Sequence, residues 1–184
     1  MRGLSKRRAA TTLRTDVEAF ERLGYRSENG PSDFAVILRG GQGARDLRLE
    51  LTGEGAVFGG NWGLEVSTAE PVLPATSGGL KARGRGVVRM QGVRFRARGG
   101  DEAAAQLAEA LSSDASLAEA VARVHFERLF IAPDGRPVIR HIGGSVVWVL
   151  FPPIVRATPL PEGQPEEIVR ALEAFAAAGG RARG

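Results

Sequence analysis

The sequence predicts an α+β fold in which a mostly antiparallel β-sheet packs against N-terminal, central and C-terminal helices, as in an α/β sandwich. Two observations support this prediction. Short segments of alternating apolar and polar residues, the pattern of half-buried strands, follow one another through glycine- and proline-containing turns. Other segments repeat their apolar residues every three or four positions, as one face of a helix does. Runs of strands separated by groups of helices favour α+β over alternating α/β folds.

Length and composition are those of a globular protein. The chain has 184 residues, 43% hydrophobic and 25% charged, and can bury a core of its own. We expect a single domain over residues 1–184, with a flexible basic arm at 1–10, a flexible tail at 179–184 and a boundary between halves near 99–101. There is no cysteine, which excludes disulfides and thiolate chemistry.

The helices near the two ends of the chain have recognisable boundaries. In the first, Thr11 or Thr12 can cap the start, and Gly24 stands where a C-terminal glycine would end the helix. The last helix has Pro165 near its start, two glutamates in its first turn and Gly179 at its expected end.

The middle of the chain, residues 101–124, favours two short helices over one long helix. Asp101 precedes the first apolar face, and Asp114 can cap a second helix within the same segment. Aspartate suits both positions because its carboxylate accepts hydrogen bonds from the unpaired N–H groups at a helix start.

Two hairpins are the clearest of the predicted strand pairs. Residues 32–39 and 44–52 flank a glycine-rich turn, and in the second strand leucines alternate with charged residues. Residues 124–132 and 137–142 flank Pro133-Asp134-Gly135, which suits a tight turn. Further short strands are expected at 56–60, 61–67, 80–90 and 92–98, with Gly92 as a candidate bulge.

The most apolar segment is 143–155. It is too short to span a bilayer, which needs about 20 residues, and the N-terminus lacks the apolar run of a signal peptide. β-Branched and aromatic residues between Gly-Gly and Pro-Pro are typical of a central strand with both faces covered. The alternative is an exposed apolar lip for a partner or lipid, formed by Trp148, Phe151, Pro152 and Pro153.

The two halves of the chain share a weak pattern. Residues 59–74 and 143–161 each contain Gly-Gly, a tryptophan and a proline-bounded end, and each follows a helix and a hairpin. This order allows an internal pseudo-repeat, although the spacing between the hairpin and Gly-Gly differs between the halves.

Positive charge is concentrated in residues 71–100, which contain seven bases and no acid. If 92–98 form a strand, Val93, Phe95 and Ala97 face the core. The arginines that alternate with them form a row on the other face, about 7 Å from one to the next. Such a row can bind phosphates or another anionic surface. The candidate anion- or nucleic-acid-binding residues are Lys81, Arg83, Arg85, Arg89, Arg94, Arg96 and Arg98.

A non-functional interpretation of this row is also open. The arginines can form a solvated sheet face, or they can pair with acids in the helices that follow, including Asp101, Glu102 and Glu109. The only aromatic residue in the row, Phe95, points the other way, so the segment lacks an RNA-recognition signature.

The only histidines, His125 and His141, lie on opposite arms of the hairpin around residues 133–135. With a type I turn and a glycine bulge, His141 falls nearly opposite Glu127, and His125 shares their face one pair along. Two imidazoles and a carboxylate can hold a metal or perform acid–base catalysis. The alternative is that both histidines are structural or surface residues, since a slip of one residue would separate the three side chains.

No motif in the sequence indicates an enzyme. The glycine-rich segment 79–86 lacks the Gly-Lys-Ser/Thr ending of a P-loop, and no segment has the dinucleotide-binding fingerprint. The Gly-x-Ser-x-Gly and His-Glu-x-x-His motifs are absent from the sequence. We therefore expect no cofactor and no metal, and favour a protein that is not an enzyme.

Residues 140–164, RHIGGSVVWVLFPPIVRATPLPEGQ, together with the helix that continues to residue 178, resemble the C-terminal part of a bacterial domain-of-unknown-function family. The resemblance rests on the Gly-Gly, tryptophan and Phe-Pro-Pro pattern. It implies a bacterial protein and neither an activity nor functional residues. In element order the chain is similar to secretion-chaperone-like α/β sandwiches, which implies a dimer that binds extended partner segments.

These observations favour a cytoplasmic, non-catalytic domain that binds an unidentified protein partner, with a homodimer as one arrangement. A first alternative is binding of nucleic acid or another anionic surface through the basic strands of 81–98. A second is a small metal-dependent or acid–base enzyme that uses His125, Glu127 and His141. Each hypothesis uses a different surface of the protein.

Overall fold

The computed structural model describes residues 2–41, 43–56, 59–85, 92–99, 101–149, 151 and 154–181. Within these residues, four helices and ten strands confirm the predicted α+β class. In chain order they are α1 (Arg2–Glu21), β1 (Arg26–Asn29), β2 (Ala35–Arg39), β3 (Leu47–Ala56), β4 (Gly59–Thr68), β5 (Leu80–Arg85), β6 (Gly92–Ala97), α2 (Glu102–Ser113), α3 (Ala115–Ala122), β7 (Phe126–Ile131), β8 (Pro137–His141), β9 (Ser145–Val149), β10 (Ile154–Thr158) and α4 (Gln164–Arg181).

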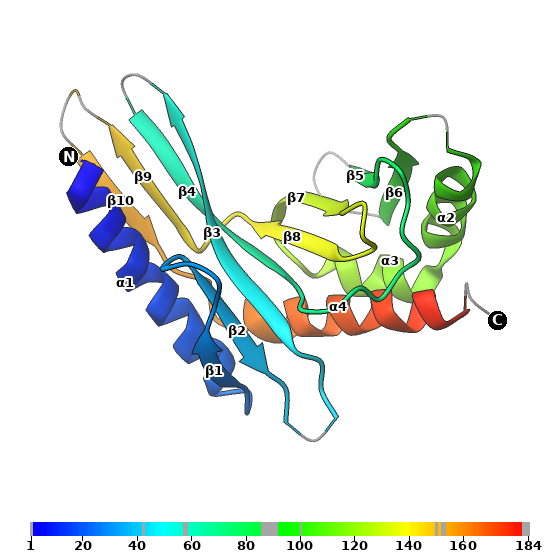
Figure 1. The fold of residues 1–184 in the computed structure, drawn as a ribbon, viewed down its shortest axis with the longest axis horizontal. Coiled ribbons are helices and arrows are strands. Elements are labelled where there is room, and N and C mark those ends of the chain that lie inside the picture. The colour runs from blue at the N-terminus through cyan, green and yellow to red at the C-terminus, as the bar shows by residue number, and fades with distance from the viewer. Residues whose placement is uncertain are drawn as a thin grey trace.

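The strands form one antiparallel sheet that divides into two branches (Figure 1). Along its main path the strand order is β1-β2-β3-β4-β8-β7-β5-β6. Strand β4 changes partner along its length, because Gly59–Trp62 pairs with β9 and Glu65–Ser67 pairs with β8. The sheet therefore divides at Gly63 and Leu64, with β9 and β10 in one branch and β8, β7, β5 and β6 in the other.

The helices pack against one face of this sheet. Helix α1 packs on β3, β9 and β10, α4 contacts β4 and β8, and α2 and α3 pack on β6 (Figure 1). The alternation in β3 follows this arrangement, because Leu47, Leu49 and Leu51 are buried beneath the helices. Phe95 of β6 meets Phe175 of α4 edge-on, with ring centroids 5.8 Å apart, in the same apolar cluster.

Several local predictions are confirmed. Asp101 and Asp114 cap α2 and α3, each accepting a hydrogen bond from a backbone N–H in the first turn. The turn at 133–135 joins β7 to β8, and its Gly135 has φ +91°, a left-handed conformation that glycine adopts without strain. The first predicted hairpin is β2 and β3, in the register Val36 opposite Leu49.

The start of the first helix differs from the prediction. Helix α1 begins at Arg2, so residues 2–10 are helical and neither Thr11 nor Thr12 is a cap. Both threonine hydroxyls instead donate to backbone carbonyls four residues earlier in the helix. The sequence before them is rich in alanine, arginine and lysine, which are strong helix formers, and Ala9 is buried against the sheet.

The end of the last helix also differs. Helix α4 runs to Arg181 and does not stop at Gly179. A Cβ atom on Gly179 would lie 2.1 Å from the carbonyl oxygen of Val72, so this glycine lets the helix approach the chain closely. Close packing, and not helix termination, accounts for the residue.

The apolar segment is only half covered. Strand β9 lies between β4 and β10, as predicted for a central strand. However, Val146 is fully buried whereas Val147 is 44% exposed, because α1 covers one face only. The expectation that both faces are covered is therefore wrong. Pro152 and Pro153 lie outside the described residues, and β10 begins immediately after them.

Two details of the other strands were not predicted. Gly92 is not a bulge, because it begins β6 in register with Arg85. Strand β1 has no apolar residue and is exposed throughout, so the alternation that identifies half-buried strands is absent from it.

Among the described residues, no helix combines the length and the apolar character needed to cross a bilayer.

Candidate anion-binding face of the sheet

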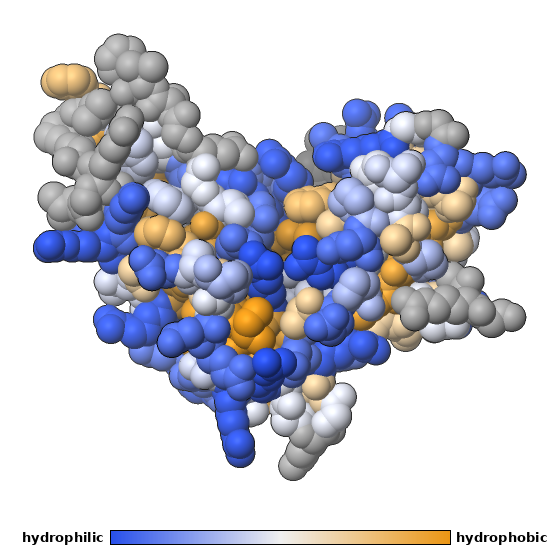
Figure 2. All heavy atoms as spheres, viewed as in Figure 1, coloured by the Kyte–Doolittle hydropathy of each residue, from blue (hydrophilic) through white to orange (hydrophobic). Residues whose placement is uncertain are grey.

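The face of the sheet opposite the helices, here called the open face, is continuous across β3, β4, β8, β7, β5 and β6. Residues directly opposite each other in an antiparallel sheet point to the same side, so the register identifies its members. Figure 2 shows a notch between the two branches of the sheet, with hydrophilic side chains along its right-hand border. By register, the open face consists of Arg48, Glu50, Glu65, Ser67, Lys81, Arg83, Arg94, Arg96, Arg128, Phe130, Val138 and Arg140.

Four exposed bases face one another on β5 and β6. Lys81 lies directly opposite Arg96, and Arg83 directly opposite Arg94. Like charges at such positions repel each other and destabilise the sheet. None of these four side chains forms an ion pair with a carboxylate of the described residues. The protein therefore keeps an unneutralised basic cluster on this branch of the open face.

The acids predicted to pair with these arginines form no ion pair with Arg94 or Arg96 among the described residues. Asp101 caps α2, and hydrogen bonds from Ser77 hold its pKa below the usual value. Glu102 begins the same helix. Glu109 lies near the arginines, on the far wall of a groove of about 500 Å³ between α2 and β6, whose strand wall includes Arg94 and Arg96.

Helix α2 is anchored beside this groove by a hydrogen bond to the strand edge. The backbone N–H of Phe95 donates to the Ser112 hydroxyl over 2.9 Å. That hydroxyl in turn donates to the carbonyl of Ala108 over 2.6 Å. The last strand of this branch is thus partly covered by side chains of α2 and remains open toward Arg94 and Arg96.

The other predicted basic residues are less central. Arg98 is exposed but follows the end of β6, where its backbone N–H donates to the carbonyl of Gly79. Arg85 ends β5, and its side chain lies outside the described residues, as does the whole of Arg89. The row predicted along one strand is therefore a two-strand cluster centred on β5 and β6.

Phe130 is the member of the open face that the sequence analysis missed. It lies in β7, directly opposite Lys81 on one side and Val138 on the other, and its side chain is half-buried. An aromatic ring therefore adjoins the basic cluster. The alternation of Phe130 with the buried Leu129 and Ile131 could have indicated its direction, but the sequence does not show that β7 adjoins β5.

Arg140 is the most deeply buried base of the open face, at 2% exposure, and lies where the sheet divides. Its Nε atom is 3.3 Å from a Glu127 carboxylate oxygen, and an Nη atom is 3.9 Å from Glu65. A Cβ atom on Gly63 would lie 2.6 Å from the same Nε, so that glycine provides the space for the guanidinium. This charge cluster joins β4, β7 and β8 at the dividing point.

The predicted group of His125, Glu127 and His141 is not assembled. His141 pairs with Phe126, and a bulge at Glu127 interrupts the register. Glu127 therefore contacts Arg140 on the open face, whereas His141 lies buried on the helix side. The two imidazole rings are near each other, with centroids 6.5 Å apart, but His125 is exposed. Within the described residues, no cluster of three histidine or acidic side chains can hold a metal ion.

His141 has a structural environment. Its Nδ1 atom accepts a hydrogen bond from the Gly143 N–H over 2.7 Å. Its Nε2 atom lies 2.9 Å from Oε1 of Gln164, so the ring donates to the first residue of α4. Burial lowers the pKa of His141. The side chain thereby joins β8 to α4, and both of its ring nitrogens are engaged in hydrogen bonds.

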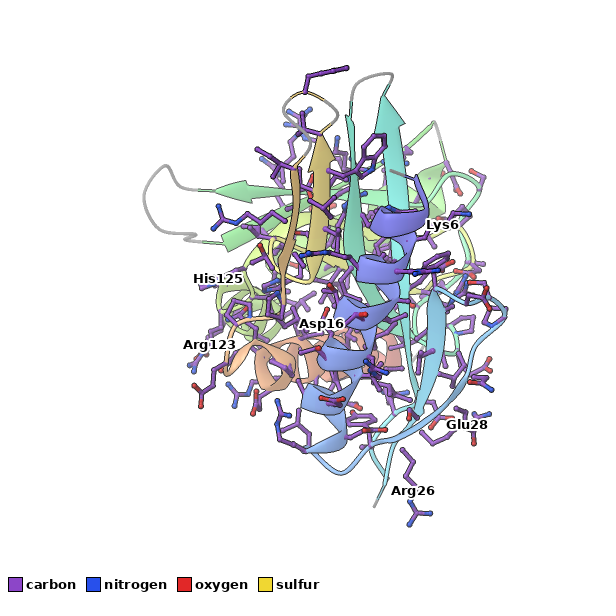
Figure 3. All side chains as sticks on the ribbon, turned by 90° about the vertical axis from the view of Figure 1, so that its left-hand side faces the viewer. Lys6, Asp16, Arg26, Glu28, Arg123 and His125 are labelled. Carbon is purple, nitrogen blue, oxygen red and sulfur yellow. The ribbon has the colours of Figure 1, made fainter. Side chains whose placement is uncertain are left out.

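Asp16 is a second buried polar residue that the sequence analysis missed. It lies in the middle of α1 (Figure 3) at 1% exposure, and its Oδ1 atom accepts the N–H of Leu160 over 2.8 Å. Its Oδ2 atom has no hydrogen-bond partner among the described residues, and it lies 3.0 Å from where a Cβ of Gly144 would be. Burial raises the pKa of this carboxyl to about 7.

The predicted apolar lip is present in part. Phe151 is 81% exposed, whereas Trp148 is half-buried on the same face of β9 as the buried Val146. Pro152 and Pro153 lie outside the described residues. This apolar end and the basic cluster of β5 and β6 occupy different branches of the sheet (Figure 1).

Comparison with known proteins places the chain in a family. The model of the family described as protein of unknown function (DUF3156) matches residues 26–178. The protein belongs to the DUF3156 family. The match includes the segment 140–178 on which the resemblance rested and extends it across most of the fold. No curated protein and no solved structure matches the chain.

In this DUF3156 protein, the open face offers two kinds of chemistry side by side. Guanidinium and ammonium groups on β5 and β6 can donate hydrogen bonds to anionic oxygens. The ring of Phe130, on the next strand, can stack on a flat apolar group. Both features suit binding of a partner, and neither requires a reaction.

Proposed function

We propose that this protein is a non-catalytic binding domain and that its open face binds single-stranded nucleic acid. The observation that carries the proposal is that two like-charged pairs lie directly opposite each other across β5 and β6, Lys81 with Arg96 and Arg83 with Arg94. All four side chains are exposed and without carboxylate partners among the described residues. Such pairs cost stability in the unbound protein. A bound chain of phosphates would neutralise them and release its own counterions.

The neighbouring aromatic residue favours nucleic acid among polyanions. Phe130 is one strand away from the basic cluster, directly opposite Lys81. Stacking of a base on an aromatic ring contributes about 1–3 kcal/mol and is available only when the base is unpaired.

The absence of assembled catalytic groups in the described part of the chain supports binding over catalysis. His141 lies on the opposite side of the sheet from Glu127, and its ring is held by Gly143 and Gln164. We therefore infer that the protein recognises its partner without changing it chemically.

Salt-dependent binding of labelled single-stranded oligonucleotides tests this proposal. In the variant Arg83→Gln/Arg94→Gln/Arg96→Gln, we expect weaker binding and a slope of log K against log salt that is smaller by about 2, because three phosphate contacts contribute roughly 0.7 each. Phe130→Leu should weaken binding to single strands and leave the salt dependence unchanged.

The control variant is Arg14→Gln/Arg22→Gln/Arg26→Gln, which removes the same charge from exposed positions in α1, directly after α1 and at the start of β1. It should retain most of the affinity and the full salt slope. Equal losses in the two triple variants would mean that only net charge matters, and absence of binding at low salt would refute the proposal.

A further inference from the structure

The tip of the β9–β10 hairpin exposes apolar side chains. Phe151 is 81% exposed, Ile154 is 50% exposed and Val147 is 44% exposed. Among the described side chains, five large hydrophobic ones are exposed, and these three belong to this one hairpin. Exposed apolar residues are common singly, but a group of them at one end of a molecule indicates an interaction site.

The neighbouring helix supplies positive charge at the same end. Helix α1 packs on β9 and β10, and its N-terminal end lies beside the start of β10 (Figure 1). The chain contains five bases and no acid before Asp16. Of these, Lys6, Arg7 and Arg8 are exposed, and Lys6 lies in the part of α1 nearest the hairpin tips (Figure 3).

We propose that this end of the protein docks on the surface of an anionic lipid bilayer. Phe151 and Ile154 enter the boundary between headgroups and acyl chains, while Lys6, Arg7 and Arg8 contact the anionic headgroups. A short apolar insertion binds a membrane weakly by itself, and a few basic residues bind it weakly by themselves. The two together give stable but reversible attachment, with each base contributing only near the surface.

The shape and the charge of this end favour a bilayer over a protein partner. The two most exposed of these residues are close together in the chain, with Phe151 between β9 and β10 and Ile154 at the start of β10. Arg156 of β10 is also exposed and adds a further positive charge close to Ile154. Exposed apolar residues with exposed bases on the adjoining helix and strand match the layered chemistry of a bilayer surface.

This site is independent of the proposed nucleic-acid face. The basic cluster of β5 and β6 belongs to the other branch of the sheet (Figure 1). Loss of one activity should therefore leave the other intact. Because anionic vesicles can also attract the basic cluster, the experiment has to separate the two sources of binding.

Co-sedimentation with lipid vesicles tests the inference, using phosphatidylcholine alone and phosphatidylcholine mixed with phosphatidylglycerol. We expect the full chain to bind the mixed vesicles and not the neutral ones, with binding reduced by salt. Phe151→Ser/Ile154→Ser should weaken binding by at least about tenfold, because it removes two apolar insertions. Lys6→Gln/Arg7→Gln/Arg8→Gln should weaken it comparably, whereas Phe151→Trp should retain it, since tryptophan favours the interface.

Two controls separate this inference from its alternatives. Ile142→Ser removes a different exposed apolar residue, 62% exposed and outside the hairpin, and should bind as the unaltered protein does. Arg83→Gln/Arg94→Gln/Arg96→Gln should also retain vesicle binding although its binding to nucleic acid is weakened. The inference is overturned if the protein ignores anionic vesicles, if Ile142→Ser loses as much as the hairpin variant, or if only the variant of the basic cluster loses binding.

Discussion

At the scale of single residues, Asp16 is a buried carboxyl group whose ionisation should change the stability of the fold. Burial raises its pKa to about 7, against the lowering effect of the hydrogen bond from Leu160. In the unfolded chain the carboxyl ionises near its ordinary value of 3.8. Between these two values the unfolded state releases a proton that the folded state retains, so the stability of the fold falls as pH rises through this window.

The variant Asp16→Asn tests this linkage. Asparagine stays neutral, so the difference in unfolding free energy between the variant and the unaltered protein should shift in favour of the variant by up to about 4 kcal/mol between about pH 4 and pH 8. Denaturant unfolding measured across this range gives the comparison. Parallel stability curves for the two proteins would show that Asp16 does not titrate in the window.

The side chain of Arg140 connects three strands at the point where the sheet divides. It is almost completely buried and lies near both Glu65 and Glu127. We expect Arg140→Ala to lower the free energy of unfolding by roughly 3 kcal/mol, because it leaves carboxylates without their cation and opens a cavity. Arg128 is directly opposite Arg140 but exposed, so Arg128→Ala should cost less than about 1 kcal/mol. Similar losses in the two variants, measured by urea unfolding, would contradict the assigned role.

At the scale of elements, the two adjacent glycines of α4 differ in what they contact. A Cβ on Gly179 would meet the Val72 carbonyl, whereas a Cβ on Gly180 would meet nothing within 4 Å. Gly179→Ala should therefore destabilise the protein by about 1–3 kcal/mol through overpacking. Gly180→Ala should stabilise it by up to about 1 kcal/mol, because alanine favours the helix. Thermal unfolding of the two variants tests this difference. Equal changes in the stability of both variants would exclude the packing explanation.

The elements were predicted best where the signal is local. Asp101 and Asp114 mark their helices because an N-cap depends on neighbouring backbone groups only. The turn at 133–135 was predictable for the same reason. The prediction of a cap at Thr12 was wrong because a threonine hydroxyl can accept from a later N–H as a cap or donate to an earlier carbonyl inside a helix. Which of the two forms depends on whether the preceding residues pack against the rest of the protein.

The candidate site was predicted only in part, for a related reason. The exposure of Arg94 and Arg96 follows from alternation within one strand. Their opposition to Lys81 and Arg83, and the nearness of Phe130, depend on pairing between strands that are distant in the sequence. The expected meeting of His141 with Glu127 was wrong because one bulged residue moves the two side chains to opposite faces.

At the scale of the whole molecule, the decisive feature is the division of the sheet along β4. One branch presents the basic cluster and the other presents the apolar hairpin tip (Figure 1). All four helices pack on one face, and on the open face the bases of β5 and β6 are exposed. The two surfaces proposed for binding therefore differ in chemistry and share no residues.

Local patterns in the sequence predict the α+β class, the central helices, the main hairpins and the concentration of positive charge, because each depends on residues close together in the chain. The order of the strands, the partner change at Gly63, the burial of Asp16 and Arg140 and the exposure of Phe151 become visible only in the folded protein. These features arise from contacts between distant segments. Periodicity shows which residues of a strand share a face, but not which other strand or helix that face will meet.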